Sequence, residues 1–263
     1  SRFKFNIISG HPKDYSIKAS EEKSLQIRSY LESNGAENIV CVLDENSLDD
    51  PRWHTGHELQ RENYIYMLEN LLERQNFGVI FKPKRMIDLR KRLGDDISSL
   101  LDKAIETGRC YLFDETKGHT TLATPVAAAL ASDVCIHGHL CAGSAALESA
   151  LAGVPTILIN REDSKASILA QLPKNSVVFA NWNDATDSVN GYFSSAKKNP
   201  EFGDWSSIIN DLDPFRDGLG AQRIGNFLES LFQGFDEGLR KEDVMARAVE
   251  IYANKWGSDK IIN

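Results

Sequence analysis

Short apolar runs alternate with helical stretches along most of this chain, and that alternation is the feature that most restricts its fold. Helical patterns separate the runs, as over residues 58–75, where one stripe is formed by Tyr64, Ile65, Leu68, Leu71 and Leu72. Five or six runs have the length and composition of buried strands: residues 39–43, 79–81, 110–113, 134–136, 156–159 and 177–180. Buried strands joined by helices pair in parallel, so the sequence predicts an α/β fold with a Rossmann-like, doubly wound sheet and closing carboxyl-terminal helices.

The most informative unit of this alternation is residues 131–160. A strand is followed there by a glycine-containing loop, a helix that opens at Gly143-Ser144, and a second strand. Gly153 and Pro155 supply the stop signal of the helix. Such a unit directs the unpaired amides and the positive dipole end of the helix toward the carboxyl end of the first strand. The sequence therefore predicts an anion, most readily a phosphate, at that place.

Composition and charge restrict the classes of partner. The chain has 263 residues, is 41% hydrophobic and carries a net charge of −8, which argues against nucleic acid as the main ligand. Its apolar runs are far shorter than the roughly 20 residues that span a bilayer, and no secretory signal is evident. We therefore expect a cytoplasmic protein without a transmembrane segment, either free or peripheral at the inner face of the membrane.

The cysteines show no CxxC pair and sit mostly in apolar, strand-like runs: Cys41, Cys110, Cys135 and Cys141. We interpret them as buried free thiols of a reducing compartment. Cys135, His137, His139 and Cys141 alternate with other residues, but four such side chains on a straight strand spread over roughly 20 Å. Only a sharply folded loop would bring them to one zinc ion, so we predict no metal. His137 and His139 remain candidates to donate to a phosphate or a sugar hydroxyl.

In open α/β sheets the ligand crevice lies beyond the carboxyl ends of the strands. Lys82, Lys84 and Arg85 follow one strand and are candidates to neutralise a phosphate, the alternative being a solvated helix start. Asp44 and Glu45 follow another strand and are candidates for a catalytic carboxylate pair, the alternative being caps for backbone amides.

A family resemblance adds to this reading. The run SAALE at residues 144–148, followed by ALAGVP at 150–155, resembles the sugar-nucleotide-binding segment of GT-B glycosyltransferases of bacterial surface-polysaccharide synthesis, such as the Kdo and sialic acid transferases. The resemblance implies that Gly143, Ser144 and Ala145 contact the donor phosphate and that Glu148 contacts the ribose. The Lys82-Pro83-Lys84 strand end is similar to the His-Pro strand end of CMP-sugar transferases, although no His precedes this proline.

The resemblance implies a glycosyltransferase whose substrate is a nucleotide sugar, such as CMP-Kdo, with no other cofactor and with a glycan or lipid-linked acceptor. We expect residues 36–263 to be the donor-binding domain. Residues 1–35 are too short for a second Rossmann domain and are expected to be a remnant of, or a link to, an amino-terminal acceptor domain. A non-catalytic nucleotide- or sugar-binding α/β module and a sugar-nucleotide epimerase remain alternatives.

Two acidic positions each have a structural alternative. With Ser144 as N-cap, Glu148 lies one residue beyond the acid of a capping box, so it is either a first-turn acid stabilised by the helix dipole or a ribose ligand. The turn at residues 213–218, followed by Arg223, is similar to the closing segment of surface-carbohydrate enzymes. Its acids are expected either to contact substrate or to cap backbone amides.

Overall fold

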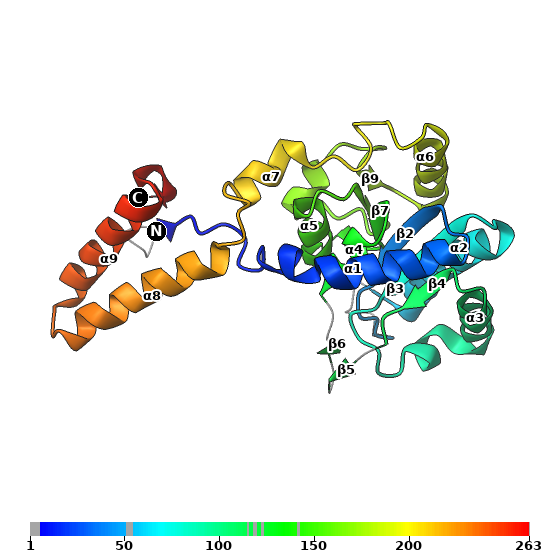
Figure 1. Cartoon of the computed structure of the whole chain (residues 1–263), viewed down its shortest axis with the longest axis horizontal. Helices are drawn as coiled ribbons and strands as arrows, with labels where there is room; N and C mark the ends of the chain where they lie inside the picture. Colours follow the sequence, from blue (N-terminus) through cyan, green and yellow to red (C-terminus); the bar gives the residue numbers. More distant parts are fainter. Residues whose placement is uncertain are drawn as a thin grey trace. The chain divides into compact units, whose positions relative to one another are not determined.

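The computed structural model describes residues 6–50, 55–114, 116–117, 120–121, 124–140 and 143–262. Its contacts divide the chain into two compact units (Figure 1), one of residues 19–208 and one that joins residues 1–18 to 209–263. The boundary expected at residue 35 does not coincide with this division, because Ile27 and Leu31 of helix α1 (Ser16–Ser33) are buried in the core of the larger unit.

The larger unit is built on a parallel sheet of six strands in the order β4-β3-β2-β7-β8-β9. The strands are β2 (Asn38–Leu43), β3 (Phe77–Lys82), β4 (Cys110–Leu112), β7 (Val134–His137), β8 (Thr156–Ile159) and β9 (Val178–Phe179). The chain adds strands on one side of β2 and then on the other side from β7 onward. This order confirms the predicted doubly wound α/β fold, and it puts the topological switch point between β2 and β7.

Helices cover both faces of this sheet. One face carries α2 (His57–Glu73), α3 (Leu89–Glu106) and α6 (Trp182–Ser194), and the other carries α1, α4 (Pro125–Leu130) and α5 (Ser144–Leu151). Val40 and Val42 of β2 are buried in the first core, whereas Cys41 and Leu43 are buried in the second. Both faces are therefore dry, which explains why every strand is a continuous apolar run.

Helix α5 begins and ends where the sequence predicts. Val154 N donates to Ser149 O at 3.2 Å and Gly153 N donates to Ala150 O at 3.0 Å, with Gly153 at φ 81°. These two bonds form a Schellman motif, which needs a residue that tolerates positive φ. At the other end Gly143 is the N-cap. Ser144 is therefore the first helical residue rather than the N-cap, and Glu148 lies in the second turn rather than the first.

The remaining elements are short or belong to the smaller unit. They are β1 (Asn6–Ile7), β5 (Thr116–Lys117), β6 (Thr120–Thr121), η2 (Ile168–Gln171), α7 (Ser206–Leu212), α8 (Gly220–Asp236), α9 (Lys241–Trp256), η3 (Ser258–Lys260) and β10 (Ile261–Ile262). The strands β1 and β10 pair antiparallel. Helices α8 and α9 were predicted, whereas α7 was not.

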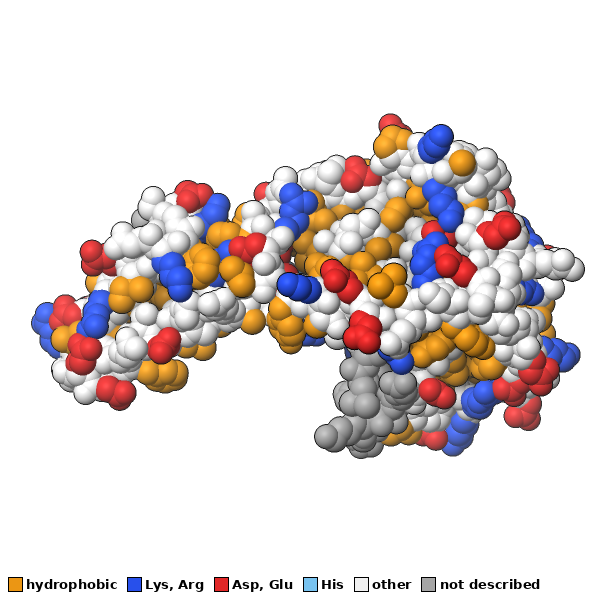
Figure 2. Space-filling view, in the orientation of Figure 1, with side chains coloured by type: hydrophobic (Ala, Val, Ile, Leu, Met, Phe, Trp, Pro, Cys, Tyr) orange, Lys and Arg blue, Asp and Glu red, His pale blue; other side chains and the backbone are white. Residues whose placement is uncertain are grey.

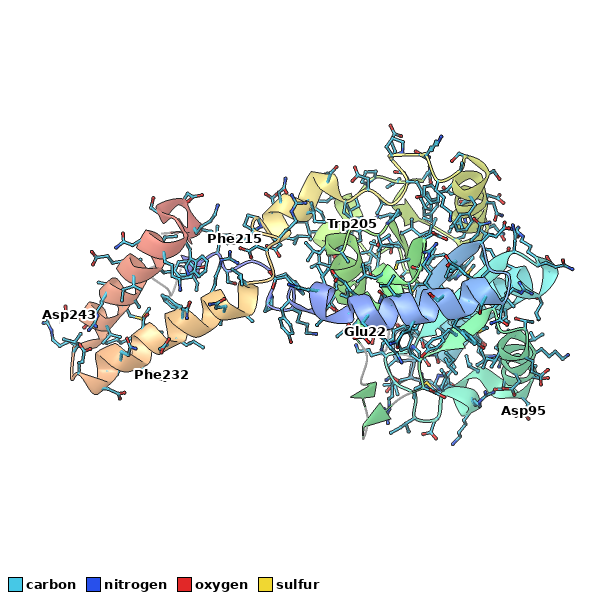
Figure 3. The ribbon with its side chains drawn as sticks, in the orientation of Figure 1. Glu22, Asp95, Trp205, Phe215, Phe232 and Asp243 are labelled. Atoms are coloured by element: carbon cyan, nitrogen blue, oxygen red, sulfur yellow. The ribbon has the colours of Figure 1, made fainter. Side chains whose placement is uncertain are left out.

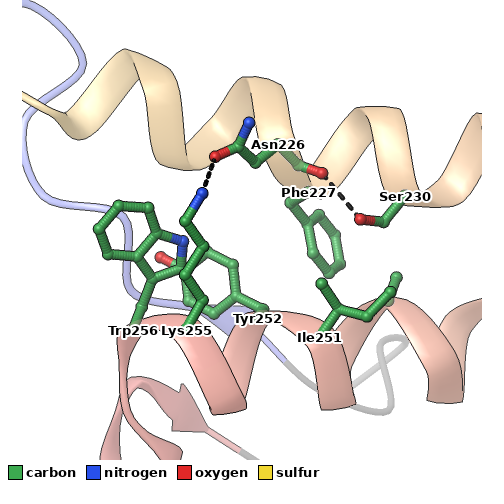
Figure 4. A pocket seen from close by; sticks show the side chains of 8 residues that line it. Asn226, Phe227, Ser230, Ile251, Tyr252, Lys255 and Trp256 are labelled. Atoms are coloured by element: carbon green, nitrogen blue, oxygen red, sulfur yellow. Dashed lines mark hydrogen bonds between the residues drawn. The ribbon is translucent and has the colours of Figure 1, made fainter.

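Helices α8 and α9 pack as a pair in the smaller unit. Lys255 Nζ donates to Asn226 Oδ1 at 2.9 Å, and the rings of Phe227 and Tyr252 meet edge to face (Figure 4). Apolar side chains also gather on the visible surface of this pair (Figure 2), and Phe232 on α8 is 65% exposed (Figure 3).

Arg223 organises the turn at residues 213–218. Its guanidinium lies 3.5 Å from the ring centroid of Phe215 and 4.5 Å from that of Trp256, and it pairs with Asp217. Asp213 Oδ1 accepts the backbone amides of Phe215 and Arg216 at 3.0 and 3.1 Å. Asp213 therefore accepts backbone amides of the turn and Asp217 pairs with Arg223. These contacts match the alternative in which the acids of the turn cap backbone amides.

Candidate functional site

The polar residues at the carboxyl edge of the sheet fall into two groups that lie on opposite faces. Because side chains alternate along a strand, Lys82 and His137 continue the face that carries α5, and Asp44 continues the face that carries α2. We call Lys82, His137 and Glu148 the α5-side group. We call Asp44, Gln60 and Tyr64 the α2-side group.

Lys82 is the cation of the α5-side group. It is only 5% exposed, its ammonium lies 5.9 Å from the ring centroid of Phe113, and it donates to Pro83 O at 3.3 Å. Burial lowers the pKa of Lys82 to about 8, although the nearby charges of Asp44 and Glu148 act in the opposite direction. A charged amine held in a largely dry position interacts more strongly with an anion than a solvated amine does.

Glu148 lies on α5, near enough for its charge to act on Lys82. It is 5% exposed, whereas Ser144, one turn earlier on the same helix face, is exposed. The dipole of α5 acts mainly on its first turn, so it no longer accounts for an acid in the second turn. A buried carboxylate beside a buried amine forms a polar pair that can bind both a hydroxyl and a phosphate.

His137 offers a hydrogen-bond donor to this group. Its Nδ1 accepts the backbone amide of His139 at 3.2 Å, so the hydrogen of the neutral ring lies on Nε2. Burial, together with the nearby ring of His139, lowers the pKa of His137 to about 4. The ring is therefore neutral at pH 7, with Nε2 as its one donor.

His139, which the sequence pairs with His137, has a different environment. Its Nδ1 lies 2.7 Å from Glu162 Oε1, and its Nε2 lies 3.5 Å from Asn63 Nδ2. Burial acts to raise the pKa of Glu162, but the contacts with His139 and Arg161 outweigh it and lower that pKa. Arg161 also donates to Asn63 Oδ1 at 2.7 Å and to Gly138 O at 3.1 Å. His139 therefore joins the loops after β7 and β8, with both ring nitrogens facing protein atoms.

Asp44 has the environment of an acid–base group. Its Oδ2 accepts Gln60 Nε2 at 2.6 Å and the Tyr64 hydroxyl at 3.4 Å. Its Oδ1 is buried and has no hydrogen-bond partner among the residues that the structure describes. Burial raises the pKa of Asp44 to about 7, against the lowering effects of the Gln60 hydrogen bond and the charge of Arg92. A carboxyl group with a pKa near neutrality can both take up and release a proton.

Glu45, the other predicted carboxylate, is already paired. Its Oε1 lies 2.5 Å from Lys84 Nζ and accepts the backbone amide of Asn46 at 3.0 Å. The predicted phosphate cluster is likewise dispersed, because Lys82 belongs to the α5-side group, Lys84 pairs with Glu45, and Arg85 lines a separate cavity. The structure does not bring the three basic residues together.

The described members of the Cys/His alternation also have separate environments. Cys135 is a buried free thiol whose Sγ lies 3.6 Å from Ser132 Oγ, and Cys41 and Cys110 are also free and buried. Cys141 lies outside the described residues, as does Ala142. Within the described ranges, no group of three or more His, Cys, Asp or Glu side chains could hold a metal ion.

The helices of the described residues include none that is long and apolar enough to cross a membrane. No protein-family model matches the sequence, and no curated protein matches it.

Proposed function

We propose that this chain is the donor-binding part of a glycosyltransferase that uses a nucleotide-activated sugar, such as a CMP-sugar, in surface-polysaccharide synthesis. The observation that carries the proposal is that buried Lys82, which follows β3, lies near enough to Glu148 on α5 for the two charges to act on each other, while α5 itself follows β7 at the switch point between β2 and β7. In sheets of this topology, that crevice is the usual place for a nucleotide.

Each part of such a ligand has a matching group on the α5 side. The Lys82 ammonium, the His137 Nε2 hydrogen and the amides at Ser144 and Ala145 would bind the phosphate. The Glu148 carboxylate would accept the ribose hydroxyls. Gly143 itself packs against Leu169, since a Cβ there would lie 2.3 Å from Leu169 Cδ1.

The transfer step needs two further contributions. The bond between the anomeric carbon and the phosphate oxygen breaks as an acceptor hydroxyl attacks, so negative charge accumulates on the departing nucleotide. Lys82 would stabilise that charge. Asp44 would accept the proton of the acceptor hydroxyl, because its pKa of about 7 suits a general base at neutral pH. Glu45 would support this edge through its pair with Lys84.

The first prediction tests the cation of the site. Replacing Lys82 with Met should weaken CMP binding by roughly 1–3 kcal/mol, because one buried charge-assisted bond is lost. Isothermal titration with CMP, UDP, GDP and CDP should show tightest binding of a pyrimidine nucleotide to the wild type. Lys84→Met is the matched control, and it should have a smaller effect because Lys84 is neutralised by Glu45. Equal losses in both variants, or no nucleotide binding by the folded wild type at millimolar concentration, would contradict the proposal.

A further inference from the structure

A second feature of the carboxyl edge is a cavity of about 500 Å³ on the α2 side. It lies between the loop that follows β2 and the loop that follows β3, and its wall includes the first residue of α2 and the first turn of α3. Its lining includes Ser47, His57, Arg85, Lys91 and Arg92. Its volume is in the range of small-molecule sites.

The charge of the cavity wall is predominantly positive. Arg85, Lys91 and Arg92 contribute three cations, against the carboxylates of Asp49 and Asp88. Neither Arg85 nor Lys91 forms an ion pair with a residue in the described ranges. The start of α2 also lies at this wall and has no side-chain hydrogen bond at its N-cap. The dipole of α2 adds to the positive potential.

Arg92 is held in a fixed position although it is close to another cation. Its Nη2 donates to Arg85 O at 2.6 Å and its Nη1 donates to Gln60 Oε1 at 3.0 Å. Its Nε is buried and lacks a hydrogen-bond partner in the part of the chain that the structure describes. Burial lowers the pKa of Arg92 and the charge of Arg85 adds to that lowering, whereas the charges of Asp44 and Asp88 act in the opposite direction. An anion in the cavity would relieve the repulsion between the two guanidinium groups.

A hydrogen-bond chain orients His57 toward the same space. Gln60 Nε2 donates to Asp44, so Gln60 Oε1 is the acceptor of the Ser47 hydroxyl at 2.5 Å. With its one hydrogen used there, Ser47 Oγ accepts from His57 Nδ1 at 2.8 Å. His57 Nε2 is then the nitrogen left for a ligand. When the ring is protonated, Nε2 donates a hydrogen bond to an anionic ligand oxygen. When the ring is neutral, Nε2 accepts a hydrogen bond from a ligand hydroxyl group.

We propose that this cavity binds the phosphate group of a small phosphorylated molecule, at a site separate from the donor-nucleotide crevice. Three cations and an oriented imidazole suit the several oxygens of a phosphomonoester. A phosphate group fills only a small part of a cavity of about 500 Å³, and Leu48 and Ile87 provide apolar wall for an organic remainder. The inference does not depend on the proposed glycosyltransferase activity.

The test uses the full chain with inorganic phosphate and glycerol 3-phosphate as probes, and glycerol as the uncharged control. The ring signals of His57, assigned by NMR with His57→Gln, should shift saturably with both phosphates and not with glycerol. Lys91→Met and Arg85→Gln should each raise the apparent Kd about tenfold or more, because each removes a charge-assisted contact. Lys103→Met, an exposed position on the same helix outside the cavity, should leave the Kd within about twofold.

Circular dichroism of each variant shows that it is folded, and a parallel CMP titration separates this inference from the proposed function. Retained CMP affinity in Lys91→Met together with lost phosphate affinity would support two sites. Two results would overturn the proposal: no saturable shift of His57 in the wild type, or unchanged phosphate affinity in Lys91→Met and Arg85→Gln.

Discussion

Replacing Asp44 with Asn should make the protein more sensitive to acid, whereas replacing His137 with Asn should make it more sensitive to a rise in pH. The reason is that burial raises the pKa of Asp44 to about 7 and lowers the pKa of His137 to about 4. Both substitutions preserve shape, since Asn can still accept the hydrogen bonds that Asp44 Oδ2 and His137 Nδ1 accept.

The two contributions have opposite signs. Between pH 4 and 6.5 the unfolded chain binds a proton at residue 137 that the folded chain does not, so the free energy of unfolding falls by about 3 kcal/mol as the pH falls through that range. Between pH 4 and 7 the folded chain keeps a proton on Asp44 that the unfolded chain has lost, so the free energy of unfolding falls by about 4 kcal/mol as the pH rises. In the wild type the two effects nearly cancel.

Urea unfolding at a series of pH values between 4 and 7 measures these slopes. The difference between each variant and the wild type isolates the residue from all other titrating groups. Relative to the wild type, the free energy of unfolding of Asp44→Asn should rise with pH. The free energy of unfolding of His137→Asn should fall with pH. The double variant should have the pH profile of the wild type. A variant whose profile runs parallel to that of the wild type would show that its residue is not held with a shifted pKa.

Replacing Glu148 with Gln should weaken ribonucleotide binding by about 1.5–3 kcal/mol, because charge-assisted bonds to the ribose hydroxyls are lost. The same change removes the negative charge beside Lys82, which by itself favours phosphate binding. The 2′-deoxynucleotide lacks one of the hydroxyls, so it should lose less affinity. Isothermal titration of both ligands therefore separates the ribose contact from the general charge effect.

Glu69→Gln provides the control for the loss of one negative charge, because Glu69 is an exposed acid on α2. It should leave the affinity of both nucleotides unchanged. Equal affinity of Glu148→Gln and wild type for the ribonucleotide would assign Glu148 to a structural role beside Lys82.

The strands and most helices could be predicted because each follows from a local pattern. The strands of the six-stranded sheet are mostly apolar runs whose side chains enter the cores on both faces, and Gly153 marks the end of α5 through its backbone conformation. Helix α7 was missed because Ser206–Leu212 is short and has Ile209 as its buried residue, too little to form an apolar stripe.

The candidate site was only partly predictable, because side-chain partners depend on how the loops fold. The sequence placed Lys82, Lys84 and Arg85 beside one strand, but it gave no signal that Lys84 would pair with Glu45. The polar residues of α2 were missed although a signal existed. Gln60 and Asn63 lie on the buried stripe of that helix, and a polar residue on an apolar stripe indicates a buried hydrogen-bond partner.

The central claim, that a nucleotide binds beside α5 at the switch point, is tested most directly by the histidine ring signals during a CMP titration. His137 belongs to the α5-side group and His57 to the cavity on the α2 side, so the two rings report on different faces of the sheet. We predict that CMP shifts the His137 signals saturably and that this response weakens in Lys82→Met. Saturable CMP binding that leaves His137 unchanged and shifts His57 instead would contradict the account.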